Sequence, residues 1–396
     1  MRELLNRSLL LLFGCQVIFV AGTVVLVTIG GLVGHELAPS PGLATLPVAL
    51  MVVGTAACTV PAALCMQALG RRRGFLVGIG LAACGAAVAM AAEPRESFWL
   101  FCAATALVGG SLAFSQQFRF AAAETVSASR VSHAVSFLLL GSIAGAMLSP
   151  EIIALSQAAN PAEPFRRVFG VMLGLYALAG VLILGLGNAA AASRNDAAPA
   201  RELRALSAQP AFLTAVLAGM IGQGVMTYIM TATPISMNVI DGFSVKETAE
   251  VIRAHVIAMY LPSLVTPFLI GRLGLSRVMA IGVVAMALTL VVGLAGHHLL
   301  HYWWSLVLLG VGWNFLFVSG TSMLTQSYAA SERFRAQAVN DFSVFGASAL
   351  ASLLAGTMLS VLGWELVLLS AAPMLMLMLA ALFWLARQPA APQPVA

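Results

Sequence analysis

Side-chain amides occur within long apolar segments of this sequence and could hydrogen-bond a solute there. They are Gln16, Gln116, Gln117, Gln223 and Asn314. An unpaired amide in hydrocarbon is costly, so such residues are expected to face a protein interior or a water-filled cavity. The alternative is that they only bond one helix to another, at about 1 kcal/mol or less each.

Hydroxyl and aromatic side chains accompany these amides at helical spacing. Gln223, Thr227 and Thr231 are separated by four residues each, which places them on one helix face, and Trp313 precedes Asn314. No paired arginines occur at mid-depth in the apolar segments, although a dicarboxylate or a sugar phosphate would need them. The pattern favours a neutral or weakly charged organic solute, of vitamin or drug type. The predicted substrate-binding residues are Gln16, Gln116, Gln223, Thr227, Thr231, Asn314 and Trp313.

The charged residues that could move a proton lie near the ends of the apolar segments. Proton coupling commonly uses a carboxylate inside the membrane. The predicted coupling or gating residues are Arg71, Arg72, Arg119, Glu124 and Asp341. The alternative for these carboxylates is that they are inner-loop charges that fasten the two halves of the chain together. The sequence has no phosphate loop, nucleophile elbow or His-Glu-x-x-His motif, so we predict no catalytic residue, metal site or cofactor.

The composition shows what must position these residues. Of 396 residues, 60% are apolar and 9% are charged, with a mean hydropathy of +0.96, whereas soluble domains are about 25% charged. This excludes a soluble enzyme, a disordered protein and a disulfide-stapled secreted scaffold. The arginines are scattered through short loops, which argues against nucleic-acid binding.

A helix needs about 20 mainly apolar residues to cross a bilayer. By that measure the sequence predicts an all-α integral membrane protein with twelve spans, and the weakest division is at Leu362-Gly363-Trp364. The predicted spans are 9–33, 42–66, 74–92, 98–120, 133–155, 167–190, 210–235, 250–271, 276–296, 303–326, 337–362 and 364–386.

The basic residues predict the orientation. With the N-terminus in the cytoplasm, fourteen basic residues lie on the cytoplasmic side and five on the other, with Arg119 left over. This agrees with the positive-inside rule. We therefore expect a multi-pass protein of a bacterial inner membrane with both termini in the cytoplasm.

The chain divides into two similar halves. Leu69-Gly70 with Arg73 recurs as Leu273-Gly274 with Arg277, 204 residues later. Polar residues are concentrated in every third span, which predicts nested three-helix repeats. The predicted domains are an N-terminal six-helix bundle (1–190), a central cytoplasmic loop (191–209), a C-terminal six-helix bundle (210–386) and a cytoplasmic tail (387–396).

Twelve spans, a polar central loop and Gly-Arg-rich inner loops together resemble the major facilitator superfamily over the whole chain. The loop after the second span ends in Gly70-Arg71-Arg72-Arg73, as in that family, but Gln67 stands where the family has an acid. The departure puts a charge-based gate at this loop in doubt. The resemblance implies alternating access about a central site, with one half rocking against the other.

The expected function is proton-coupled secondary transport of a small organic solute, by a monomer in the bilayer, and uniport is the alternative to proton coupling. A riboflavin-like vitamin uptake facilitator and a drug or metabolite efflux pump are both compatible with the sequence. Alternatives of another class are a receptor that transports nothing and a membrane-embedded enzyme. The enzyme would need clustered acids, histidines or a metal site at the membrane boundary.

Overall fold

The computed structural model describes residues 6–39, 43, 46–159, 164–187 and 203–388. Within these residues the chain is helical and has no strand. Eleven helices in the described ranges are long and apolar enough to cross a membrane, and a bent pair of helices adds a twelfth candidate. The fold class predicted from the sequence is confirmed.

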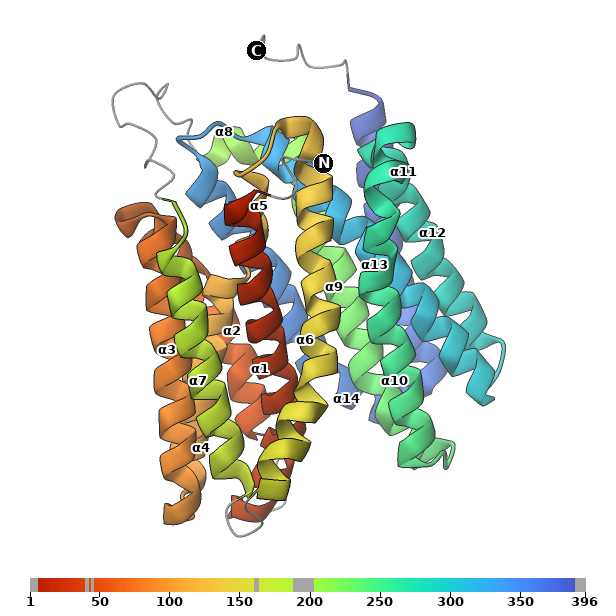
Figure 1. Cartoon of the computed structure of the whole chain (residues 1–396). Coiled ribbons are helices and arrows are strands. Elements are labelled where there is room, and N and C mark those ends of the chain that lie inside the picture. The colour runs from red at the N-terminus through yellow and green to blue at the C-terminus, as the bar shows by residue number, and fades with distance from the viewer. Residues whose placement is uncertain (1–5, 40–42, 44–45, 160–163, 188–202, 389–396) are drawn as a thin grey trace. The chain divides into compact units, whose positions relative to one another are not determined.

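The chain forms two compact units. Figure 1 colours the chain by residue number, from red at the N-terminus to blue at the C-terminus. Unit 1 comprises residues 1–198 together with Gln337–Phe342, and unit 2 comprises 199–336 and 343–396. The helices of unit 1 are α1 (Arg7–Leu37), α2 (Leu46–Leu69), α3 (Arg71–Ala92), η3 (Glu93–Arg95), α4 (Phe98–Ser115), α5 (Phe118–Ala123), η4 (Ala128–Arg130), α6 (Val131–Ala159) and α7 (Pro164–Leu184).

The second unit begins with a short helix that falls inside the predicted central loop. Most of that loop, and most of the predicted tail, lie outside the described residues. The helices of this part are α8 (Leu203–Ser207), α9 (Pro210–Ile235), η5 (Ser236–Ile240), α10 (Val245–Tyr260), η6 (Leu261–Leu264), α11 (Thr266–Leu273), α12 (Leu275–Leu294), α13 (Leu299–Ser327) and α14 (Arg333–Ala386), of which Gln337–Phe342 count with unit 1.

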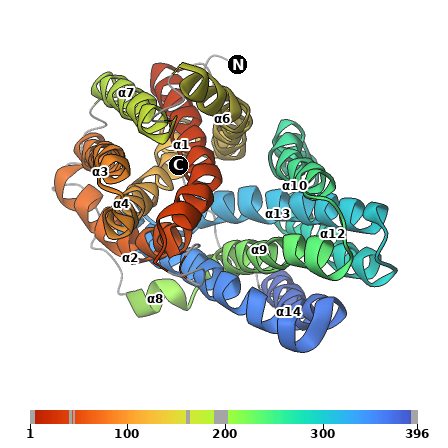
Figure 2. The same ribbon diagram turned by 90° about the horizontal axis from the view of Figure 1, so that it is seen from below.

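Small residues let helices cross closely within unit 1. A Cβ added at Gly109 of α4 would lie 2.2 Å from the carbonyl oxygen of Met51 in α2. A Cβ at Gly145 of α6 would lie 2.5 Å from the carbonyl oxygen of Val17 in α1. Such backbone contacts are how membrane helices gain packing energy without a hydrophobic driving force. Figure 2 shows these four helices from below the view of Figure 1.

Two spans are not simple helices. The predicted span 250–271 is the bent pair, in which Glu247–Leu264 and Thr266–Leu273 meet at 51°. The last two predicted spans are joined within α14 at Gly363, which has a φ of 77°. Glycine adopts this left-handed conformation without steric cost, so it can turn the chain where no loop is present. This is the division that the sequence marked as weakest.

Candidate functional site

In unit 2, polar and aromatic side chains from four helices meet around Trp313. The indole Nε1 of Trp313 donates a hydrogen bond to Oε1 of Gln223 at 2.8 Å. The Trp313 ring is stacked on Phe317, with 4.6 Å between ring centroids and 19° between planes. Tyr260 meets Trp313 edge-on at 5.8 Å. We call the following residues the Trp313 cluster: Gln223, Thr227, Tyr260, Trp313, Phe317 and Ser348.

The amide orientation of Gln223 follows from this hydrogen bond. An indole nitrogen can only donate, so the Gln223 atom that faces it must be the carbonyl oxygen. The amide nitrogen then has two hydrogens to place, and its hydrogen bond among the described residues is a long one of 3.4 Å to Thr227. Gln223, Thr227 and Thr231 are all half-buried. This face of α9 therefore retains donor capacity for a ligand.

The two unit 1 amides differ in how fully they are used. The amide nitrogen of Gln16 in α1 donates to the hydroxyl of Ser142 in α6 at 3.0 Å. Gln116 is half-buried at the turn between α4 and α5, and its side chain makes no hydrogen bond within the described part of the chain. Gln116 is thus available to a ligand, whereas Gln16 also joins two helices.

Asn314 has the role that the helix-bonding alternative describes. It is fully buried in α13, and its amide nitrogen donates to the carbonyl oxygen of Met259 and to the hydroxyl of Ser263, both at 2.7 Å. Its carbonyl oxygen accepts from the hydroxyl of Thr266 at 2.7 Å. These partners lie on both sides of the bend between α10 and α11. Asn314 therefore holds the broken span against α13, and we do not retain it among the ligand contacts.

A second group of residues forms a buried ionic cluster in unit 1. Arg71 at the start of α3 pairs with Glu124 at 2.7 Å. The Arg71 guanidinium also donates to Oε1 of Gln117 at 2.8 Å and to Oε1 of Gln337 at 2.6 Å. Only 6% of the Arg71 side chain is exposed. We call the following residues the Arg71–Asp341 cluster: Arg71, Gln117, Arg119, Glu124, Gln337, Asn340 and Asp341.

Asp341 lies at the other end of this cluster. Its carboxylate pairs with Arg119 of α5 and accepts hydrogen bonds from Gln117 at 2.6 Å and from Asn340 at 3.0 Å. Asp341 is 1% exposed and Arg119 is 4% exposed. Buried charges are tolerated when they are paired and hydrogen-bonded. Two guanidinium groups balance two carboxylates here, so the cluster is electrically neutral.

The structure brings together four of the five residues predicted for coupling or gating. Arg72 is half-buried and forms no ion pair among the described residues. The sequence predicts Gln117 only as a buried amide, and it does not predict Gln117 or Gln337 as a member of the cluster. A straight helix over span four would put Gln116 and Arg119 on one stripe, but α4 ends at Ser115 and α5 begins at Phe118. Because the helix is interrupted there, the side chain of Gln117 points toward Arg71 and Asp341. The spacing of four residues between Gln337 and Asp341 was a usable signal.

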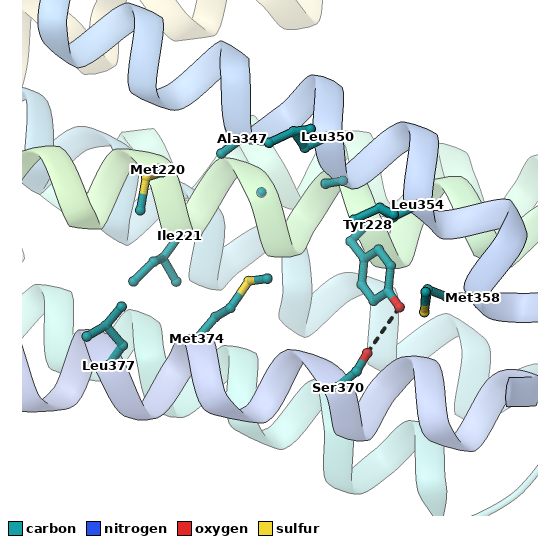
Figure 3. Close-up of a pocket in the computed structure, with 12 residues that line it drawn as sticks. Met220, Ile221, Tyr228, Ala347, Leu350, Leu354, Met358, Ser370, Met374 and Leu377 are labelled. Atoms are coloured by element: carbon teal, nitrogen blue, oxygen red, sulfur yellow. Dashed lines mark hydrogen bonds between the residues drawn. The ribbon is translucent and has the colours of Figure 1, made fainter.

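A cavity of about 430 Å³ lies elsewhere in unit 2, between α9 and the two segments of α14 (Figure 3). Among the residues drawn in Figure 3, the one hydrogen bond between lining side chains joins the hydroxyls of Tyr228 and Ser370, at 3.1 Å. The other lining residues are apolar or glycine. Leu350 and Leu377 on its walls are 62% and 51% exposed. The cavity has none of the hydrogen-bonding groups of the Trp313 cluster, so it is a poorer candidate for a polar solute.

Comparison with known proteins assigns the family. The model of the Major Facilitator Superfamily matches residues 11–249 and 242–396. The chain belongs to the major facilitator superfamily. It is therefore a membrane transporter and not an enzyme, as predicted from the sequence.

Relatives within the superfamily include proteins of similar length. The riboflavin transporter RfnT of Brucella anthropi is 34% identical over 362 residues, which cover 91% of each chain. The uncharacterized MFS-type transporter YddS of Bacillus subtilis is 26% identical, covering 98% of this chain and 92% of the relative.

Solved structures of major facilitator superfamily transporters share the fold at low identity. The major facilitator superfamily transporter FucP in the outward conformation matches with a TM-score of 0.75 and 16% identity, covering 98% of this chain and 100% of FucP. A bacterial homologue of the iron transporter ferroportin matches with a TM-score of 0.75 and 14% identity, covering 97% and 100%.

Proposed function

We propose that this transporter moves a small, neutral or weakly charged, planar organic solute of the riboflavin type by alternating access. One support is the relative named a riboflavin transporter, with 34% identity over 91% of both chains. The observation that carries the proposal is the hydrogen bond from Trp313 to Gln223, because it fixes which atoms α9 offers to a ligand.

The groups offered by α9 match the edge of a flavin ring. The indole N–H of Trp313 donates to the carbonyl oxygen of Gln223, so the amide nitrogen of Gln223 is the group left for a ligand. The hydroxyl of Thr227, which shares a hydrogen bond of 2.8 Å with that of Ser348, and the hydroxyl of Thr231 lie one and two turns further along the same face. A flavin presents ring carbonyl oxygens at one edge, and these accept hydrogen bonds from such donors. In this proposal Trp313 is a positioning residue, and Gln223, Thr227 and Thr231 contact the solute.

Transport by the purified protein in liposomes tests the substrate class. We expect time-dependent uptake of labelled riboflavin by the wild type. Gln223→Leu should reduce that uptake at least tenfold while leaving the melting temperature close to that of the wild type. Gln326→Leu is the matched control, since Gln326 is exposed near the end of α13. If the folded wild type neither binds nor takes up riboflavin, the proposed substrate class is wrong.

For gating and coupling, the Arg71–Asp341 cluster is the proposed element. Gln337–Phe342 count with unit 1 by their contacts, whereas the following residues of α14 belong to unit 2. Any movement of this end of α14 relative to α3 and α5 must break the hydrogen bonds of Gln337 and Asp341. Protonation of a carboxylate in the cluster would weaken it, which offers a route for proton coupling.

Uptake driven by a pH gradient tests this role. We expect Asp341→Asn to abolish accumulation driven by the gradient and to retain downhill flux. Glu124→Gln should have a smaller effect, since the Glu124 side chain is 24% exposed and Asp341 is 1% exposed. Accumulation by Asp341→Asn at the wild-type level would place coupling elsewhere.

The cellular setting is proposed from the charge bias and the bacterial relatives. The transporter acts as a monomer in a bacterial inner membrane, with both termini in the cytoplasm. Fusions of a cytoplasmic and a periplasmic reporter enzyme to each terminus test the orientation. Activity of the periplasmic reporter at either end would contradict it.

A further inference from the structure

Three segments of unit 2 are joined at one histidine outside the substrate and gating residues. His297 lies in the turn between α12 and α13. Its Nδ1 is 3.0 Å from Oδ2 of Asp241, which follows η5, and its Nε2 is 2.8 Å from Oε1 of Glu365, near the start of the last span. The imidazole thus bridges two carboxylates that are 124 positions apart in the sequence, from residue 241 to residue 365.

The partners determine the protonation state of His297. A neutral imidazole has one N–H and one acceptor nitrogen, whereas an imidazolium has two N–H groups. Ionised carboxylates can only accept hydrogen bonds. Both short contacts are satisfied together when the ring carries two protons. The His297 side chain is 42% exposed, so its second proton can exchange with the surrounding water.

The rest of this site holds Asp241 in place. The hydroxyl of Tyr302 in α13 donates to Oδ2 of Asp241 at 2.7 Å, and Tyr302 also hydrogen-bonds the hydroxyl of Ser236 at 2.7 Å. Tyr302 is 1% exposed. The Asp241 carboxylate is therefore anchored to α13 whether or not His297 is charged. Glu365 is 54% exposed, and its one ion pair among the described residues is with His297.

The titratable groups that face this site in the described residues are Asp241, Tyr302 and Glu365. Asp241, from the segment after η5, and Glu365, from α14, both face His297. Tyr302, from α13, faces Asp241. His298 and His301 pack on each other with 5.8 Å between ring centroids and form no ion pair in the described ranges.

We propose that His297 is a proton-binding switch that, when protonated, fastens the end of η5, the α12–α13 turn and the start of the last span to one another. With the ring charged, one cation lies between two anions. Loss of the proton removes at least one of the two hydrogen bonds and leaves two carboxylates facing each other across a neutral ring. Asp241 keeps its bond from Tyr302 in either state, whereas the ion pair of Glu365 in the described residues is with His297, so loss of that pair leaves the start of the last span unfastened.

The electrostatic environment supports this geometry. The hydrogen bond to Asp241, opposed in part by burial, and the hydrogen bond to Glu365 raise the pKa of His297 above its ordinary value of 6.5. A group whose pKa is higher in the folded protein contributes stability that is complete below its unfolded pKa. That stability is lost as the pH rises through the folded pKa. The fastening is therefore complete below pH 6.5 and is lost as the pH rises through the raised pKa of His297.

Two measurements on the full-length protein in detergent test the switch. The first compares melting temperatures of the wild type and His297→Gln between pH 5.5 and pH 9. We expect the wild type to be more stable below about pH 6.5 and the difference to disappear toward pH 9. His298→Gln is the matched control, an exposed neighbour without carboxylate partners, and should follow the wild type. A difference that does not vary with pH would overturn the proposal.

The second measurement needs no variant to be stable across the whole range. NMR of histidine-labelled wild-type protein, with the His297 signal assigned by its absence from His297→Gln, gives the titration directly. We expect a midpoint above 6.5 in the wild type and a lower midpoint in Glu365→Gln. A wild-type midpoint at or below 6.5 would overturn the proposal. Neither result depends on which solute is transported, so the proposed function and the switch can fail separately.

Discussion

Replacing Asp341 by leucine should destabilise unit 1 strongly, because the change isolates a buried charge. Arg119 is 4% exposed, and its ion pair in the described chain is with Asp341. Removing one partner of a buried pair costs about 3–5 kcal/mol, whereas exposed pairs are worth about 0–1 kcal/mol. The expected cost for Asp341→Leu is therefore about 3–5 kcal/mol, or two to three and a half powers of ten in the unfolding equilibrium.

A double-mutant cycle separates charge isolation from loss of packing. Replacing a buried pair by apolar residues of similar volume is often close to neutral. We therefore expect Arg119→Met with Asp341→Leu to be more stable than Asp341→Leu alone by about 2 kcal/mol or more. Glu151→Leu is the control, because Glu151 is exposed on α6 and its replacement should change stability by about 0.5 kcal/mol or less.

The assay is reversible unfolding of purified variants in mixed micelles, followed by circular dichroism as a denaturing detergent is added. Equal stability of Asp341→Leu and the wild type would refute the claim that Arg119 and Asp341 form a buried ion pair in unit 1. Costs that simply add in the double variant would refute the claim that the two side chains interact.

Three further predictions follow from individual contacts. Trp313→Phe keeps the ring stack but removes the donor to Gln223, so riboflavin affinity should fall roughly tenfold, by about 1.4 kcal/mol, in a binding titration while the melting temperature changes little. Asn314→Leu should lower the free energy of unfolding by about 1–3 kcal/mol, because it leaves buried groups without partners; unchanged stability in the micelle assay would contradict its structural role. Gly109→Ala should reduce stability by about 1–3 kcal/mol, because its Cβ would meet Met51 at 2.2 Å, and a melting temperature equal to the wild type would show that the helices can separate freely.

Much of the fold was predictable because the bilayer imposes span lengths. The twelve predicted spans correspond to eleven helices in the described residues and one bent pair. Pro262 and Pro267 are the sequence signal for the bend, but the run around them is mainly apolar and long enough to be one span. Where a helix breaks inside a long apolar segment depends on the groups that pair its free backbone, and Asn314 supplies such pairing from a distant helix.

The polar residues could be identified from the sequence, but their roles could not be separated. Gln223 and Asn314 look alike as buried amides in central helices. They differ in their partners: Trp313 leaves the nitrogen of Gln223 largely unused, whereas Asn314 has three partners at 2.7 Å. Likewise Gln116 and Gln117 are neighbours, yet only Gln117 reaches Asp341. Periodicity assigns residues to a helix face but does not report which hydrogen bonds are already made.

The discontinuous make-up of unit 1 affects the order in which it can fold during synthesis. Residues up to 198 leave the ribosome first and carry both Arg71 and Arg119, but of the two cluster carboxylates only Glu124 comes with them. Asp341 follows more than 140 residues later. Until then, one buried guanidinium lacks its counter-ion, and the nascent first half must keep this end hydrated or bound to another protein. A fragment ending in the central loop would remain permanently in that unfinished state, and the missing carboxylate could be restored by co-expressing the second half.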